Sequence, residues 1–209
     1  IDRAQPDLTP GEKYLRTLEH LGSGSLISDV SQYTLNNLQK SYAQLDQGTV
    51  EQIVDILLRS DRKYIAGFRG TACCAQYMAS KLLFLTPHVV PILHADATAV
   101  ENLLDITERD CLFLYSFPRY SEIARPLMEI ARESGAKVIL MTDRRTSPLA
   151  NKADVVVTAQ VDGLGFTNSY VAPLSLSEVI LLSVSGRKDV KDSKRFNRID
   201  SVMEREKLY

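Results

Sequence analysis

Five short apolar segments, separated by longer stretches of chain, constrain the fold more than any other feature of this sequence. They are residues 63–67 (KYIAG), 89–93 (VVPIL), 111–116 (CLFLYS), 137–142 (KVILMT) and 154–158 (DVVVT). Their residues are apolar at successive positions, whereas a strand with one face in water alternates apolar and polar residues. Strands of a parallel sheet covered by helices on both faces show this pattern. The sequence therefore predicts a three-layer α/β fold around a five-stranded parallel sheet.

The remaining segments carry helical patterns. Over residues 50–58, apolar side chains recur at the spacing of one helix face. Further helices are predicted at about 10–21, 71–85, 96–104, 121–134, 148–151, 168–185 and 193–207. The helices that precede the first strand are additional to those that cover the sheet. We accordingly predict an N-terminal helical linker over residues 1–45 and an α/β ligand-binding domain over residues 46–209.

Charge and composition exclude several classes of protein. Lys and Arg number 25 against 26 Asp and Glu, so the net charge is −1 and lacks the basic excess of a free-standing nucleic-acid binder. No apolar run approaches the ~18 residues of a membrane span, and residues 1–10 lack the apolar core of a signal peptide. The 3 cysteines, two of them adjacent, do not form a disulfide framework, which favours a cytoplasmic protein. The 3 histidines lack metal-ligand spacing, so we expect no metal and no cofactor.

Two loops of the predicted sheet carry residues suited to binding an anion. In the flavodoxin-like strand order 2-1-3-4-5, ligands bind beyond the carboxyl ends of the first and third strands. The first loop, GFRGTA, has Gly67 and Gly70 for close backbone approach and the Thr71 hydroxyl at the start of a helix. It matches neither a dinucleotide-binding fingerprint nor a Walker A loop. Taken alone, it is equally consistent with a plain strand-to-helix turn.

The second loop, SFPRYS, also joins a strand to a helix. Ser116 ends the strand, and Ser121 is predicted to cap the following helix. Hydroxyls, helix N-terminal amides and the Arg119 guanidinium together make a cradle for an anion. The alternative is that Ser121 only caps its helix while Arg119 lies in solvent.

The order of these motifs resembles that of the SIS (sugar isomerase) domain, and within it the effector domain of RpiR-type transcriptional regulators. Members of the family resemble strand–GxGxS–helix, strand–SxSGxT–helix, a GA-K-VI-IT strand, SPLA and an AD-containing strand in succession. The corresponding residues here are 67–71 (GFRGT), 116–121 (SFPRYS), 135–142 (GAKVILMT), 147–150 (SPLA) and 153–154 (AD). The resemblance covers nearly the whole chain and implies an SIS-like fold.

The resemblance also implies that the two loops bind a phosphorylated sugar through hydroxyls and backbone amides. The ligand-binding residues carried over are Gly67, Arg69, Gly70, Thr71, Ser116, Pro118, Arg119 and Ser121. Three of them depart from the family pattern, because Arg69 and Arg119 replace glycines and Pro118 replaces a serine. Either the two arginines grip an anion and favour a more anionic ligand, such as a sugar-acid phosphate or a carboxylate, or they fill the pocket or face solvent.

Three functions fit this resemblance. The first is an effector domain that binds a phosphosugar or related anionic sugar derivative, forms a homodimer or higher homo-oligomer, and controls DNA binding by an N-terminal helix-turn-helix domain. The chain begins with Ile and contains no such motif, so we expect that domain to precede it. The second is an aldose–ketose isomerase, which needs a general base. The third is a dimerisation module that binds no ligand.

Four residues were considered as the base of an isomerase. They are His88, His94, Glu122 and Glu178. None belongs to a recognisable catalytic constellation, so we predict no catalytic residue and no enzyme activity. The effector-domain function is the one we favour.

Overall fold

The predicted sheet is present with the predicted strand order. The computed structural model describes residues 9–21, 25–165, 167–191 and 194–207. Five parallel strands form one sheet in the order β2-β1-β3-β4-β5. The strands are β1 (Lys63–Gly67), β2 (Val89–Ile92), β3 (Cys111–Tyr115), β4 (Lys137–Thr142) and β5 (Val155–Thr158). Each differs from its predicted bounds by no more than one residue, which confirms the fold class.

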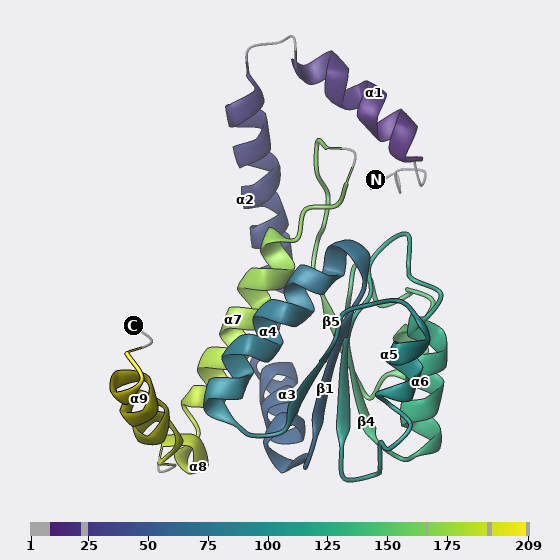
Figure 1. The fold of residues 1–209 in the computed structure, drawn as a ribbon. Coiled ribbons are helices and arrows are strands. Elements are labelled where there is room, and N and C mark those ends of the chain that lie inside the picture. The colour runs from purple at the N-terminus through teal and green to yellow at the C-terminus, as the bar shows by residue number, and fades with distance from the viewer. Residues whose placement is uncertain (1–8, 22–24, 166, 192–193, 208–209) are drawn as a thin grey trace.

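Helices cover both faces of the sheet and continue beyond it at both ends of the chain (Figure 1). They are α1 (Pro10–Leu21), α2 (Leu26–Gln44), α3 (Gln47–Arg59), α4 (Ala72–Leu85), α5 (Ala97–Glu101), α6 (Ala124–Glu133), α7 (Val171–Ser185), α8 (Lys188–Lys191) and α9 (Arg195–Arg205). Helices α3, α4 and α7 lie on one face, and α5 and α6 on the other (Figure 1). Helix α2 packs on α7 and rises away from the sheet toward α1 (Figure 1). None of the described helices is long and apolar enough to cross a membrane.

The side chains of each strand divide between two cores. Ile65, Phe113 and Ile139 pack under α3, α4 and α7, while Leu112 and Leu140 pack under α5 and α6. Because successive residues of a strand point to opposite faces, burying both faces requires the continuous apolar runs seen in the sequence. These two cores hold the strands in register and place their carboxyl ends along one edge.

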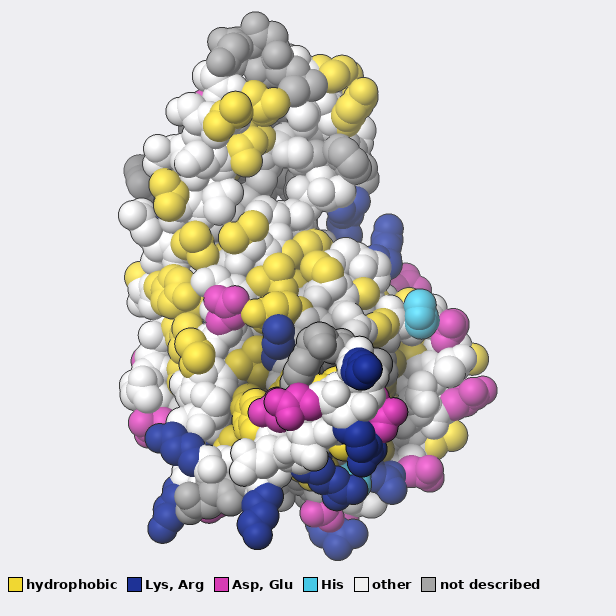
Figure 2. Space-filling view, turned by 60° about the vertical axis from the view of Figure 1, so that its left-hand side comes forward, with side chains coloured by type: hydrophobic (Ala, Val, Ile, Leu, Met, Phe, Trp, Pro, Cys, Tyr) yellow, Lys and Arg dark blue, Asp and Glu magenta, His cyan; other side chains and the backbone are white. Residues whose placement is uncertain are grey.

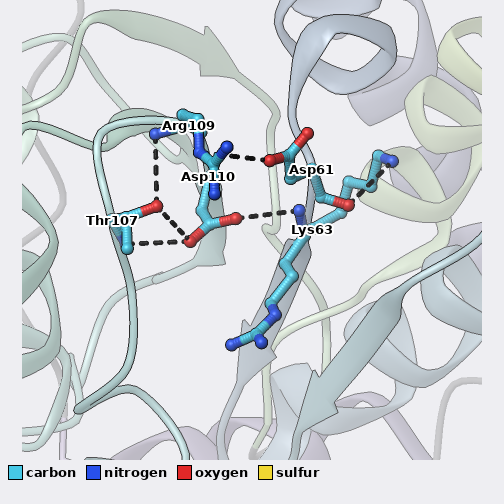
Figure 3. A network of polar contacts seen from close by, with 6 residues as sticks. Asp61, Lys63, Thr107, Arg109 and Asp110 are labelled. Carbon is cyan, nitrogen blue, oxygen red and sulfur yellow. Dashed lines mark hydrogen bonds and ion pairs between the residues drawn. The ribbon is translucent and has the colours of Figure 1, made fainter.

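A polar network closes the opposite edge of the sheet (Figure 3). The Asp110 carboxylate is buried and accepts hydrogen bonds from the backbone N–H of Arg62 at 2.9 Å and from Thr107, through its N–H at 2.8 Å and its hydroxyl at 2.9 Å. The Lys63 amine, whose pKa burial lowers, donates to the carbonyl oxygens of Asp61 at 3.5 Å and Pro87 at 3.3 Å. The network ties the beginning of β1 to the beginning of β3. Its donors and acceptors bond to one another, and we infer that the network stabilises the fold.

Two predicted helix starts were wrong. Helix α6 begins at Ala124, so Ser121 is not its N-cap; the Ser121 carbonyl instead accepts from the Ala124 N–H at 3.0 Å. Helix α7 begins at Val171 instead of residue 168. In both cases a proline, Pro126 or Pro173, is the third residue of the helix. Proline is tolerated only in the first turn, where no intrahelical N–H is needed, and this sets both starts.

Smaller differences concern short elements. The predicted helix at 148–151 is a 3₁₀ turn over Ala150–Lys152, and α5 covers only Ala97–Glu101 of the predicted 96–104. The predicted helix at 193–207 is α9, although residue 193 lies outside the described part of the chain. Residues 1–8 and 22–24 of the predicted linker are likewise outside it. The division into a linker over 1–45 and a domain over 46–209 stays a proposal.

Candidate functional site

A cavity of about 360 Å³ opens at the carboxyl ends of β1 and β3, where the two predicted loops meet. Its lining comprises Phe68, Arg69, Gly70, Thr71, Tyr115, Ser116, Phe117, Pro118, Arg119, Ser121, Ala124, Thr167 and Tyr170. Every residue predicted to bind ligand is in this lining except Gly67. A Cβ at Gly67 would lie 2.6 Å from the Thr71 carbonyl oxygen, so Gly67 allows the loop to fold back on α4. Ligand binding by the other residues stays a prediction.

Thr71 shapes the first loop from within. Its buried hydroxyl accepts a hydrogen bond from the Phe68 N–H at 2.8 Å and lies 2.9 Å from the Phe68 carbonyl oxygen, to which it donates. The Tyr115 carbonyl, at the end of β3, is 3.3 Å away. Because these bonds use the hydroxyl, Thr71 holds the loop against β3 and has little capacity left for a ligand.

Unlike Thr71, Ser116 has a side-chain hydroxyl that forms no hydrogen bond with the described residues. The residue is nevertheless only 4% exposed. Its backbone N–H donates to the Met141 carbonyl at 3.0 Å, which fixes the residue at the end of β3. A buried hydroxyl without a partner costs free energy, of the order of 1–3 kcal/mol. A ligand oxygen in the adjoining cavity would supply the missing partner.

Two arginines of the cavity lining adopt a backbone conformation that favours glycine. The φ angles of Arg69 and Arg119 are +56° and +66°. This left-handed region costs a residue with a Cβ about 1–2 kcal/mol. Both arginines stand where the family pattern has glycine, so the loops keep their glycine-like shape although the residue has changed. Neither guanidinium has a hydrogen bond or ion pair to the described residues, and the cavity lining contains no carboxylate.

A third segment of the lining was missed by the sequence reasoning. Tyr170 packs edge-on against Phe117, with ring centroids 6.0 Å apart, and lies so close to Gly70 that a Cβ there would be 2.8 Å from the tyrosine ring. Burial raises the pKa of Tyr170. The Asn168 amide donates to the Pro118 carbonyl at 3.3 Å. Both residues follow β5, whose carboxyl end shares the edge of the sheet with β1 and β3, and that placement is the signal that could have indicated them.

The residues considered as a general base lie elsewhere. His88 is at the amino edge of the sheet. His94 is not in the cavity lining; it lines a neighbouring hollow with Cys73, and Arg69 borders both hollows. Glu178 accepts a hydrogen bond from the Tyr77 hydroxyl at 2.8 Å, between α7 and α4. Glu122 is exposed and is not in the cavity lining. No group of three or more metal-ligating side chains occurs among the described residues.

The SIS domain matches residues 56–183, which include both loops and all five strands. The chain belongs to the SIS domain family. No curated protein matches this SIS domain. Solved structures with the same fold include the sugar isomerase domain of an RpiR transcription factor from Sphaerobacter thermophilus, at 22% identity and a TM-score of 0.79, covering 87% of this chain and 99% of the other.

Two further relatives of this SIS domain illustrate the range of the fold. The Vibrio vulnificus NanR protein complexed with ManNAc-6P is 17% identical, with a TM-score of 0.72 over 89% of this chain and 71% of NanR. A Methanococcus jannaschii protein whose structure infers a 3-hexulose-6-phosphate isomerase is 14% identical, with a TM-score of 0.61 over 83% of this chain and 96% of the other. The same fold thus occurs in regulators and in proteins assigned isomerase activity.

Proposed function

We propose that this SIS domain is the effector domain of an RpiR-type transcriptional regulator and binds a phosphosugar or a related anionic sugar derivative. The observation that carries the proposal is the cavity at the ends of β1 and β3, with the unpartnered Ser116 hydroxyl and no acidic side chain in its lining. Such a cavity accepts negative charge and offers a donor for a phosphate oxygen. The phosphosugar bound by NanR supports the same class of ligand here.

An isomerase is the second candidate, favoured by the Methanococcus jannaschii relative. Such chemistry requires a base within about 3 Å of the sugar proton. The cavity lining offers hydroxyl groups, two guanidinium groups and apolar side chains, with no histidine or carboxylate among them. We therefore expect binding without turnover, and interconversion of a bound aldose and ketose phosphate would contradict the proposal.

A chain of hydrogen bonds links the cavity to the N-terminal helices, and we propose that it carries the response to the ligand. The segment between β5 and α7 holds Tyr170 at the cavity, and within it the Ser169 N–H donates to the Val161 carbonyl at 3.0 Å. The beginning of the same segment is bonded to α2: the Gln160 N–H donates to the Ser41 hydroxyl at 2.8 Å, and the Asn37 amide donates to the Asp162 carbonyl at 2.6 Å. A ligand that moves Tyr170 would thereby shift α2.

We propose that two subunits pair through the N-terminal helices. Apolar side chains gather on the face formed by α1, α2 and α7 (Figure 2). The exposed ones on these helices are Tyr14, Leu15, Leu18, Leu26, Ile27, Val30, Tyr33, Leu35, Tyr42, Val171 and Leu182. A surface of this kind is typical of a protein interface. We propose a homodimer in which the linker over 1–45 joins the ligand-binding domain to a helix-turn-helix domain that contacts DNA.

Thermal unfolding with a panel of sugar phosphates, including ManNAc-6P, tests the proposed ligand class. Because a ligand that binds only the folded state raises its Tm, a member of the correct class shifts Tm by several degrees at saturating concentration. The Ser116→Ala variant should lose about tenfold in affinity, as expected for one hydrogen bond to a charged group. Ser147→Ala is the matched control, since Ser147 is also buried and unpartnered but lies outside the cavity. A flat response to the whole panel would favour the ligand-free dimerisation module.

A further inference from the structure

The two arginines of the cavity differ from the arginines that pair with another part of the described chain. Arg109 pairs with the Asp61 carboxylate, Arg187 with the Asp55 carboxylate, and Arg195 donates to the Leu83 carbonyl. Arg69 and Arg119 have no such partner among the described residues, although they line the same cavity from two different loops. Among the described residues, no carboxylate forms an ion pair with either positive charge.

The backbone at both positions lies in the left-handed region that favours glycine. With φ angles of +56° and +66°, each loop retains its shape, and each substitution adds only a side chain that carries a positive charge. Strained non-glycine residues of this kind cluster at ligand sites, where the surrounding structure holds them. Two such residues on facing loops alter the charge of one cavity without altering its framework.

We infer that the effector carries a second anionic group besides its phosphate, and that Arg69 and Arg119 select for it. The inference rests on the proposed function. The Ser116 hydroxyl already offers a donor to the phosphate, so two guanidinium groups add positive charge beyond that donor. A carboxylate accepts two parallel N–H bonds from a guanidinium, which an uncharged hydroxyl of a sugar cannot do. The ligand class is a sugar-acid phosphate.

Calorimetric titration with two matched probes tests this selection. 6-Phosphogluconate carries a phosphate and a carboxylate, while glucose 6-phosphate carries the phosphate alone. We expect the protein to bind 6-phosphogluconate at least tenfold more tightly, the size of one charge-assisted hydrogen bond. In the Arg69→Gly/Arg119→Gly variant, whose glycines suit both φ angles, the two affinities should agree within about threefold because only the 6-phosphogluconate affinity falls.

The double variant Arg59→Gln/Arg198→Gln is the control for net charge. Both residues are exposed and lie outside the cavity, so this variant should keep the preference of the parent protein. Equal binding of the two probes by the parent protein would overturn the inference and leave the proposed function intact. An equal loss of both affinities in the glycine variant would also overturn it, since the arginines would then hold the phosphate. Binding of neither probe at 10 mM would count against the proposed function itself.

Discussion

Arg69 and Arg119 show how a loop can retain a conformation while its side chain changes. Arginine disfavours φ angles near +60°, and the Arg69 and Arg119 φ angles of +56° and +66° are held by the packing of the neighbouring residues. The Thr71 hydroxyl fixes the first loop to Phe68, and the Asn168 amide fixes the second at Pro118. Local structure of this kind is stable only because the rest of the site supports it.

Replacing either arginine by glycine should therefore increase stability. Removal of the left-handed strain gains about 1–2 kcal/mol, and the greater freedom of glycine in the unfolded chain offsets about 0.5–1 kcal/mol of it. Urea unfolding of Arg69→Gly or Arg119→Gly should show a gain of roughly 0.5 kcal/mol.

Arg125→Gly is the matched control for that experiment. Arg125 is exposed in the first turn of α6, where its φ angle is not in the left-handed region and glycine is the poorer helix former, so its variant should be less stable than the parent protein. If Arg69→Gly and Arg119→Gly lost stability as Arg125→Gly does, the left-handed φ angles of Arg69 and Arg119 would not be a source of strain.

At the scale of elements, the strands were predictable from the sequence, but the starts of α6 and α7 were not. Burial of both sheet faces imposes continuous apolar runs, which are visible without a structure. The start of α6 depends on Pro126, which limits the helix to two preceding residues, whereas Ser121 offers the stronger local cap signal. The segment after β5 was missed because Thr167 and Tyr170 reach the cavity through the sheet topology and carry no local motif.

The attachment of α2 to the segment after β5 can be tested through Asn37. Its amide donates to the Asp162 carbonyl at 2.6 Å, so Asn37→Ala should cost about 1 kcal/mol and speed amide hydrogen exchange in residues 159–165. The neighbouring Asn36 is exposed on the same helix, and Asn36→Ala should change neither quantity. Equal exchange in the two variants would argue against this connection as the route from the cavity to α2.

Asp154 makes the pairing of β4 with β5 dependent on pH. Partial burial raises the pKa of its carboxyl, but the Val138 N–H at 2.8 Å and the Lys137 amine at 2.9 Å more than offset this and lower the pKa overall. The stabilisation is thus fully present above the unfolded-state pKa of about 3.9 and is lost as the pH falls through the lower folded-state value.

The Asp154→Asn variant should be less stable than the parent protein near pH 7, because it loses the charged acceptor for the Val138 N–H and the Lys137 amine. The loss should be only about 1 kcal/mol, because water partly screens the carboxylate. The difference should shrink as the pH falls below about 4. Urea unfolding between pH 7 and pH 3.5 measures it. Glu101→Gln, at an exposed carboxylate outside the sheet, should show no such trend, and a difference independent of pH would contradict the assignment.

At the scale of the whole molecule, the cavity and the proposed pairing surface involve different elements. The cavity lies at the carboxyl edge of the sheet. The exposed apolar side chains lie on α1, α2 and α7 (Figure 2). Ile27 is 89% exposed on α2 and Leu182 is 70% exposed on α7, and both belong to this set of exposed apolar side chains. Substitutions can therefore be placed in the cavity or on the proposed pairing surface without removing a side chain of the other.

Sedimentation of the Ile27→Glu/Leu182→Glu variant tests the proposed homodimer. Two charges buried in an apolar interface should weaken association by at least a hundredfold, so the variant should sediment as a monomer while keeping its ligand affinity. Leu104→Glu is the control, since Leu104 is 64% exposed on the α5 side of the sheet. A parent protein that is monomeric at all concentrations would contradict the proposed dimer.

Helix α2 has the proportions of a lever. Ser41, near its attached end, is 15 residues from Leu26 at its other end, which corresponds to about 22 Å along the axis. A tilt of about 10° around Ser41 would displace the far end by roughly 4 Å. In the proposed response, a small shift of the chain near Ser41 would therefore produce a larger displacement at Leu26, because the two residues are separated by most of the length of α2. Shortening α2 by whole turns would reduce the displacement of its far end and leave the cavity lining unchanged.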